Sequence, residues 1–164
     1  MIKESTIEQV VEQFETQQVF YEKAVQDFAR QQPALLSFLM SETEGVFSED
    51  ELDFMLYLAV VIHQSVEKDM AEELERVAEE DIALAEEANW AVMSEARGKD
   101  FREKLDVFFE KTTQEDLLAF VEDALTTGGE DEDGENVNLT PEGQEPMFVT
   151  LKTVIDVLTT DHIR

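Results

Sequence analysis

The amino-acid sequence predicts an all-α protein with a single domain over residues 1–164. Apolar residues recur at three- and four-residue spacing along most of the chain, and capping patterns precede several of these stretches. Glycine and proline are rare, with 6 and 3 residues. The hydrophobic fraction of 43% is ample for a packed core. We expect six to seven helices around an apolar central helix at about residues 49–66, with an acidic loop at 128–146.

The first helix is expected at about residues 6–31. Ser5 and Glu8 have the spacing of a capping box, in which each side chain accepts from a free backbone N–H of the first turn. Gln17 and Gln18 interrupt the apolar stripe of this helix. The stripe repeats every seven residues and contains Ile7, Phe14, Tyr21 and Phe28.

A short second helix is expected to begin at Pro33, since proline fits the first turn of a helix. We expect Gly45 to end this segment. Its apolar face consists of Leu35, Leu36, Leu39 and Met40.

The third helix has the clearest start in the sequence. Ser48 and Glu51 form a second capping box, and Phe47 with Leu52 have the spacing of a hydrophobic staple. Because the following residues are apolar on nearly all sides, we expect this helix to lie in the middle of the domain.

No glycine or proline occurs between Gly45 and Gly98, so residues 49–97 could form one long helix or two. We expect two, with a break near Lys68, Asp69 as N-cap and Gly98 as a left-handed terminator. The inward residues of the later helix are expected to be Leu74, Val77, Leu84, Ala88 and Val92.

Three further helices complete the expected fold. Asp100 precedes a helix that buries Phe101, Leu105, Phe108 and Phe109. A turn at Thr112 and Thr113 precedes a helix that ends at Gly128. Residues 146–159 have helical apolar spacing, but their valine and threonine content leaves a strand open.

The charge and composition exclude several classes of protein. Forty Asp and Glu against twelve Lys and Arg give a net charge of −28, which disfavours nucleic acids and anionic membranes. The chain has no cysteine, so it has no disulfide, thiolate metal site or cysteine nucleophile. We expect a cytoplasmic protein without a signal peptide, because the first residues are polar. The longest apolar run, Phe54–Ile62, is too short to span a membrane.

The acidic loop is a candidate divalent-cation site. Alternating acids followed by a glutamate imitate the ligand spacing of a twelve-residue calcium loop. The candidate ligands are Asp131, Asp133, Glu135 and Glu142. Asn136 stands where that loop needs glycine, which weakens the match.

Glutamate pairs recur every seven residues before and beside Trp90, a residue type that is common in interface hot spots. Seven residues are two helical turns, so the pairs would form an acidic ridge suited to a basic partner. The ridge contains Glu72, Glu73, Glu79, Glu80, Glu86 and Glu87. An ordinary solvated helix face explains the same pattern.

His63 lies in the apolar central helix, with Glu67 one turn later. Such a pair could bind a metal or transfer protons. A ferritin-like site needs Glu at the position of Val60, so we expect His63 to be a buried core residue that resists protonation.

We find none of the common nucleotide-binding, serine hydrolase or zinc protease motifs. The favoured function is therefore a non-enzymatic interaction or adaptor module, without a cofactor, that presents an acidic surface to a basic protein partner. Three alternatives stay open: Ca²⁺ or Mg²⁺ binding by loop 131–142, an enzyme or metal site at His63 and Glu67, and a nucleic-acid mimic.

Overall fold

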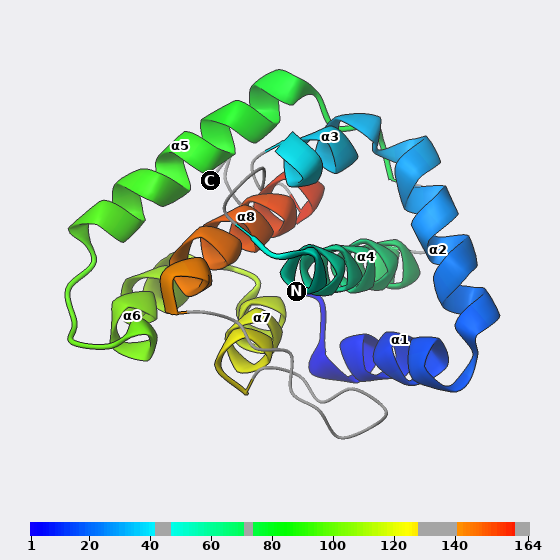
Figure 1. The fold of residues 1–164 in the computed structure, drawn as a ribbon, viewed down its shortest axis with the longest axis horizontal. Helices are drawn as coiled ribbons and strands as arrows, with labels where there is room; N and C mark the ends of the chain where they lie inside the picture. Colours follow the sequence, from blue (N-terminus) through cyan, green and yellow to red (C-terminus); the bar gives the residue numbers. More distant parts are fainter. Residues whose placement is uncertain (42–46, 71–73, 128–140, 160–164) are drawn as a thin grey trace.

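The computed structural model describes residues 1–41, 47–70, 74–127 and 141–159. Over these ranges the chain forms eight helices and no strand, which confirms the all-α fold with a slightly higher helix count than expected. The helices are α1 (Glu4–Thr16), α2 (Gln18–Gln31), α3 (Pro33–Ser41), α4 (Glu49–Met70), α5 (Glu79–Glu95), α6 (Phe101–Lys111), α7 (Glu115–Thr127) and α8 (Pro141–Thr159). Figure 1 shows α4 and α8 in the middle, with the other helices around them.

The first expected helix is in fact two helices, because the backbone breaks at Gln17. This residue has extended φ and ψ angles of −138° and 96°, and α2 continues in a new direction (Figure 1). The break allows Phe14 of α1 and Tyr21 of α2 to pack on the same ring. Their ring centroids lie 6.3 and 5.5 Å from that of Tyr57 on α4.

The expected capping box at Ser5 and Glu8 is also wrong, because α1 begins two residues earlier than expected, at Glu4. The N-cap residue Lys3 makes no side-chain capping bond. Instead, the backbone N–H of Glu4 donates to Oδ2 of Asp116 on α7 at 2.9 Å. A free N–H of the first turn needs an acceptor, and here a distant helix supplies it.

Helix α3 begins at Pro33, as predicted. Leu35 and Leu39 are fully buried, whereas the expected inward residue Met40 is 46% exposed. Gly45, the expected end of this segment, lies outside the described residues.

The capping box of α4 is confirmed. The Ser48 N–H donates to Oε1 of Glu51 at 3.0 Å, and the Glu51 N–H donates to Oγ of Ser48 at 3.1 Å. Residues 58–63 are buried without interruption. Because α4 contacts α1, α2, α3 and α8, it holds the central position expected of an apolar helix.

The break within residues 49–97 is confirmed, but it lies later and is longer than expected. Helix α4 ends at Met70 and α5 begins at Glu79, so Asp69 belongs to the last turn of α4 and is not an N-cap. The sequence signal was misleading because a capping pattern does not act inside a helix that tertiary packing extends.

The segment before α5 is held by Gln32, whose side chain is fully buried. Its amide nitrogen donates to the Glu75 carbonyl at 2.9 Å, and its oxygen accepts from the Val77 N–H at 2.9 Å. One side chain therefore satisfies two backbone groups of a non-helical segment.

The expected inward residues are confirmed only in part. Leu74, Val77 and Val92 are partly buried against the core, but two others are not. Leu84 is 62% exposed and Ala88 is also exposed. The residues of α5 that are buried are Ile82, Ala85, Asn89 and Met93. Apolar residues occur on both faces of this helix, so periodicity alone does not choose between them; packing against α8 does.

Helices α6 and α7 agree with the prediction. The Asp100 side chain accepts from the Glu103 N–H at 2.9 Å and caps α6, which buries Leu105 and Phe108. Thr112 Oγ1 accepts from the Gln114 N–H at 2.9 Å, just before α7. The fully buried residues of α7 are Leu117, Leu118, Val121 and Leu125.

Gly98 is not the helix terminator that we expected, because α5 ends at Glu95 with Ala96 as C-cap. Its φ of +157° and its surroundings still require glycine. A Cβ at this position would lie 2.6 Å from Cβ of Glu103, so the missing side chain lets the connection approach the first turn of α6.

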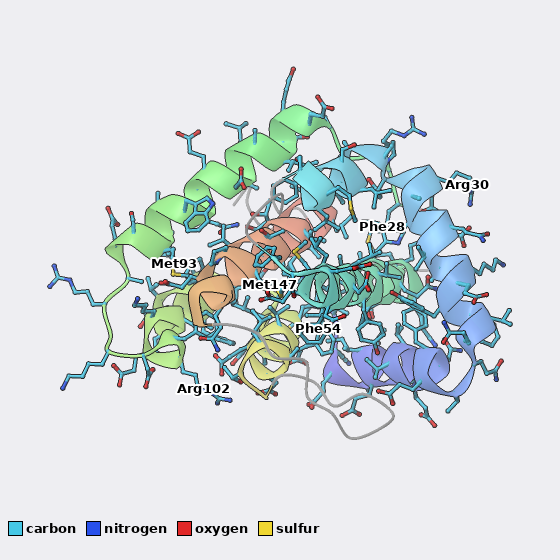
Figure 2. All side chains as sticks on the ribbon, viewed as in Figure 1. Phe28, Arg30, Phe54, Met93, Arg102 and Met147 are labelled. Carbon is cyan, nitrogen blue, oxygen red and sulfur yellow. The ribbon has the colours of Figure 1, made fainter. Side chains whose placement is uncertain are left out.

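The last segment is a helix and not a strand. Helix α8 begins at Pro141, so residues 141–146 are helical and the expected loop boundary at 146 is wrong. Residues 128–140 lie outside the described ranges. Twelve consecutive residues, 147–158, are buried, which makes α8 a second central helix. In Figure 2, Met147 lies among the interior side chains, whereas Arg30 and Arg102 lie at the edge.

None of the described helices combines the length and hydropathy needed to cross a membrane.

Candidate functional site

The calcium-loop prediction stays a prediction. Asp131, Asp133 and Glu135 lie outside the described residues, and Glu142 lies in the first turn of α8. Among the described residues, no group of three or more acids and histidines is placed to hold a metal ion.

Four of the six glutamates of the expected ridge lie on α5. Glu72 and Glu73 lie outside the described residues, and α5 begins at Glu79. Glu80 and Glu87 are exposed along with Glu79, while Glu86 is half-buried. Trp90 is 40% exposed beside them, so this face presents acids and one aromatic side chain to solvent.

His63 is a buried residue in apolar surroundings. It is 1% exposed, and its ring lies edge-on to Phe28 with centroids 5.3 Å apart. Within the described ranges, its Nε2 atom has no hydrogen-bond partner. Burial lowers the pKa of His63 to about 4, against a smaller opposing effect of Asp27. His63 therefore stays neutral near pH 7.

A buried polar cluster joins α5 to α8, and the sequence reasoning missed it. The Nδ2 group of Asn89 donates to Oδ2 of Asp156 at 2.9 Å and to Oγ1 of Thr153 at 3.1 Å. Lys152 and Asp156 form a buried ion pair one helical turn apart. The sequence pattern that could have revealed this cluster is the pair of opposite charges at Lys152 and Asp156, four residues apart within an apolar stretch. The cluster satisfies its own polar groups and fixes the two helices together.

A groove with a volume of about 380 Å³ lies between α1 and α7. Six of its ten lining residues are acidic and none is basic. The acidic ones are Glu4, Glu8, Glu12, Glu15, Asp116 and Asp123. The apolar ones are Ile7, Val11, Ala119 and Phe120. We call this feature the acidic groove.

Helical periodicity explains how each wall is built. On α1 the glutamates follow each other at intervals of four, four and three residues, which places them along one face. Ile7 and Val11 occupy the adjacent face and turn toward the core. On α7, Asp116 and Asp123 are two turns apart, with Phe120 between them. Each wall therefore has an acidic edge and an apolar base.

The two walls are joined directly at one end. The Ile2 N–H donates to Oε1 of the Gln114 side chain at 2.9 Å, beside the bond from the Glu4 N–H to Asp116. Both bonds lie at the beginning of α1 and of α7. The position of one wall is therefore fixed relative to the other.

The described residues do not pair the carboxylates along most of the α1 wall. Over the described ranges, Glu8, Glu12 and Glu15 take part in no ion pair. The field extends into the core, because Glu15 adds to the effect of burial in raising the pKa of Tyr57 to about 12. A cationic ligand would relieve this repulsion.

A second hollow of about 340 Å³ lies between α1, α2 and α4. Its lining includes Lys23 and Lys68 together with Asp27. Because both signs of charge are present, this hollow does not favour a cationic ligand as the acidic groove does.

Sequence reasoning did not find the acidic groove. The signal on α1 was a row of glutamates beside Ile7 and Val11, which also describes an ordinary amphipathic helix. Only the pairing of α1 with α7 turns this row into one wall of a groove.

A scan of the chain against protein-family models gives no match, and neither do searches of curated proteins and of solved structures. The structure itself gives the description that is possible: an all-α protein with an acidic groove, whose apolar base lies between two rows of carboxylates.

Proposed function

We propose that this chain is a non-enzymatic interaction protein that binds a basic segment of a partner protein in the acidic groove. The observation that carries the proposal is the composition of the groove lining: six carboxylates, four apolar residues and no basic residue. The overall charge of −28 acts in the same direction.

The two parts of the lining would serve different purposes. Rows of like charge attract an oppositely charged partner and speed its association. The apolar base offers surface whose removal from water favours the bound state. A small cation would use only the first of these, whereas a basic polypeptide with apolar side chains would use both.

The cytoplasm is the proposed location, supported by the absence of cysteine from the chain. Direct binding of nucleic acid does not fit a groove walled by carboxylates. Cation binding by loop 131–142, chemistry at His63 and Glu67, and nucleic-acid mimicry stay alternatives to this proposal.

The test is calorimetric titration of the protein with a panel of synthetic basic peptides that contain both lysine and leucine. The double variant Glu8→Gln, Glu12→Gln removes two groove charges. The matched control, Glu80→Gln, Glu87→Gln, removes two exposed charges on α5. Both variants change the net charge equally.

We expect at least one peptide to bind, with an affinity that falls as salt screens the carboxylates. The groove variant should weaken binding about 3- to 10-fold, as expected for two exposed charge pairs. The α5 variant should have little effect. If no peptide binds, or if both variants weaken binding equally, the proposal is wrong.

A further inference from the structure

We propose that the segment bound in the acidic groove is an amphipathic α-helix of the partner, with an apolar stripe flanked on both sides by lysine or arginine. This inference rests on the proposed function and specifies the conformation of the ligand. It follows from which hydrogen-bonding groups the groove offers and from how they are arranged.

The lining side chains offer acceptors and no donors. A carboxylate only accepts hydrogen bonds, and the other lining residues have apolar side chains. Beyond the first turn, the backbone N–H groups of α1 and α7 are bonded within their helices. In the first turn of α1, the Glu4 N–H is already bonded to Asp116.

An extended peptide would bring a backbone carbonyl at every residue, and the lining side chains of the groove have no donor for any of them. A helix satisfies its own carbonyls internally. Such a ligand needs only to present donors from its side chains, and lysine and arginine present donors alone.

The shape of the groove agrees with this conformation. The α1 wall spans Glu4 to Glu15, which at 1.5 Å per residue is about 16 Å, or three helical turns. The apolar base lies between the walls, where Val11 and Phe120 are half-buried. A helix laid between α1 and α7 would place its apolar stripe on this base and would pack as one more helix of the bundle.

The unequal walls also predict an asymmetry in the ligand. The α1 wall carries four carboxylates, and the α7 wall carries two, Asp116 and Asp123. The flank of the bound helix that faces α1 should therefore carry more basic residues than the flank that faces α7.

The experiment compares two synthetic peptides of about 15 residues, which is about four helical turns. The amphipathic peptide has leucine at helical spacing, with a longer lysine row on one flank. The scrambled peptide has the same composition in an order that mixes leucine and lysine around the helix. Both are titrated into the full chain, and circular dichroism follows peptide helicity.

We expect the amphipathic peptide to bind at least about tenfold more tightly than the scrambled one and to gain helicity on binding. Val11→Ser should weaken binding of the amphipathic peptide more than binding of the scrambled peptide. Ala88→Ser, on the exposed face of α5, is its control and should change neither affinity.

If both peptides bind equally, and binding still falls in the Glu8→Gln, Glu12→Gln variant, the helical inference is wrong while the proposed function stands. The helical inference is also wrong if the bound peptide stays non-helical, or if spermine competes for the acidic groove as well as the amphipathic peptide does. If neither peptide binds, the proposed function fails with the inference.

Discussion

Asn89 of α5 donates a hydrogen bond to the buried carboxylate of Asp156 on α8 at 2.9 Å, and this contact sets which face of α5 is buried. The same amide nitrogen also donates to Thr153. A helix with apolar residues on both faces thus takes its orientation from a polar residue.

Asn89→Ala should lower the free energy of unfolding by about 1–3 kcal/mol, because it removes a donor from a buried carboxylate. Urea denaturation measures this change. Glu87→Ala, on the exposed face of the same helix, is the control and should stay within about 0.5 kcal/mol of the parent protein. Equal effects of the two substitutions would contradict the role assigned to Asn89.

Gln32→Ala should release the segment that precedes α5, because the Glu75 carbonyl and the Val77 N–H both lose their partner. We expect a loss of about 1–3 kcal/mol and faster proteolytic cleavage around residues 74–78. Limited proteolysis with mass spectrometry locates the cleavage. Unchanged cleavage in the variant would show that other contacts hold this segment.

Gly98→Ala should destabilise the protein by about 1–3 kcal/mol, since alanine is strained at a φ of +157° and its Cβ would overlap that of Glu103. Thermal or urea denaturation reports the change. At a position compatible with alanine, the same substitution would stabilise the protein by up to about 1 kcal/mol. A stabilised variant would therefore refute the close approach.

His63 should make stability depend on pH in the acid range. Its pKa falls from the ordinary value of 6.5 to about 4 in the folded protein, so the unfolded chain binds the proton more readily between these values. The contribution of His63 to stability is therefore complete above pH 6.5 and is lost as the pH falls toward 4, by up to about 3 kcal/mol.

The check is urea denaturation of the parent protein and of His63→Leu from pH 7 to pH 4. Carboxylate titration is common to both proteins, so the difference between them isolates the histidine. As the pH falls, the free energy of unfolding of the leucine variant should rise relative to that of the parent protein. A difference that stays constant over this range would contradict a neutral, buried His63.

Short-range sequence patterns predicted the structure correctly where residues close in sequence bond to each other. Ser48 and Glu51 bond to each other, and Asp100 bonds to the nearby Glu103, so spacing alone was enough to find both helix starts. The all-α class followed from the same kind of short-range pattern.

Features that depend on distant partners could not be found in this way. The start of α1 is capped by Asp116 and not by Ser5 or Glu8, and the face of α5 depends on Asp156. The acidic groove belongs to this group, because neither of its walls is distinctive until α1 and α7 lie side by side.

The bond between the Glu4 N–H and Asp116 also has a consequence for how the protein is made. The two residues are 112 positions apart, so the first turn of α1 is capped only when most of the chain is present. Contacts of such long range form late, after a large loss of chain entropy. On the ribosome, the acidic groove would take shape only after α7 has emerged.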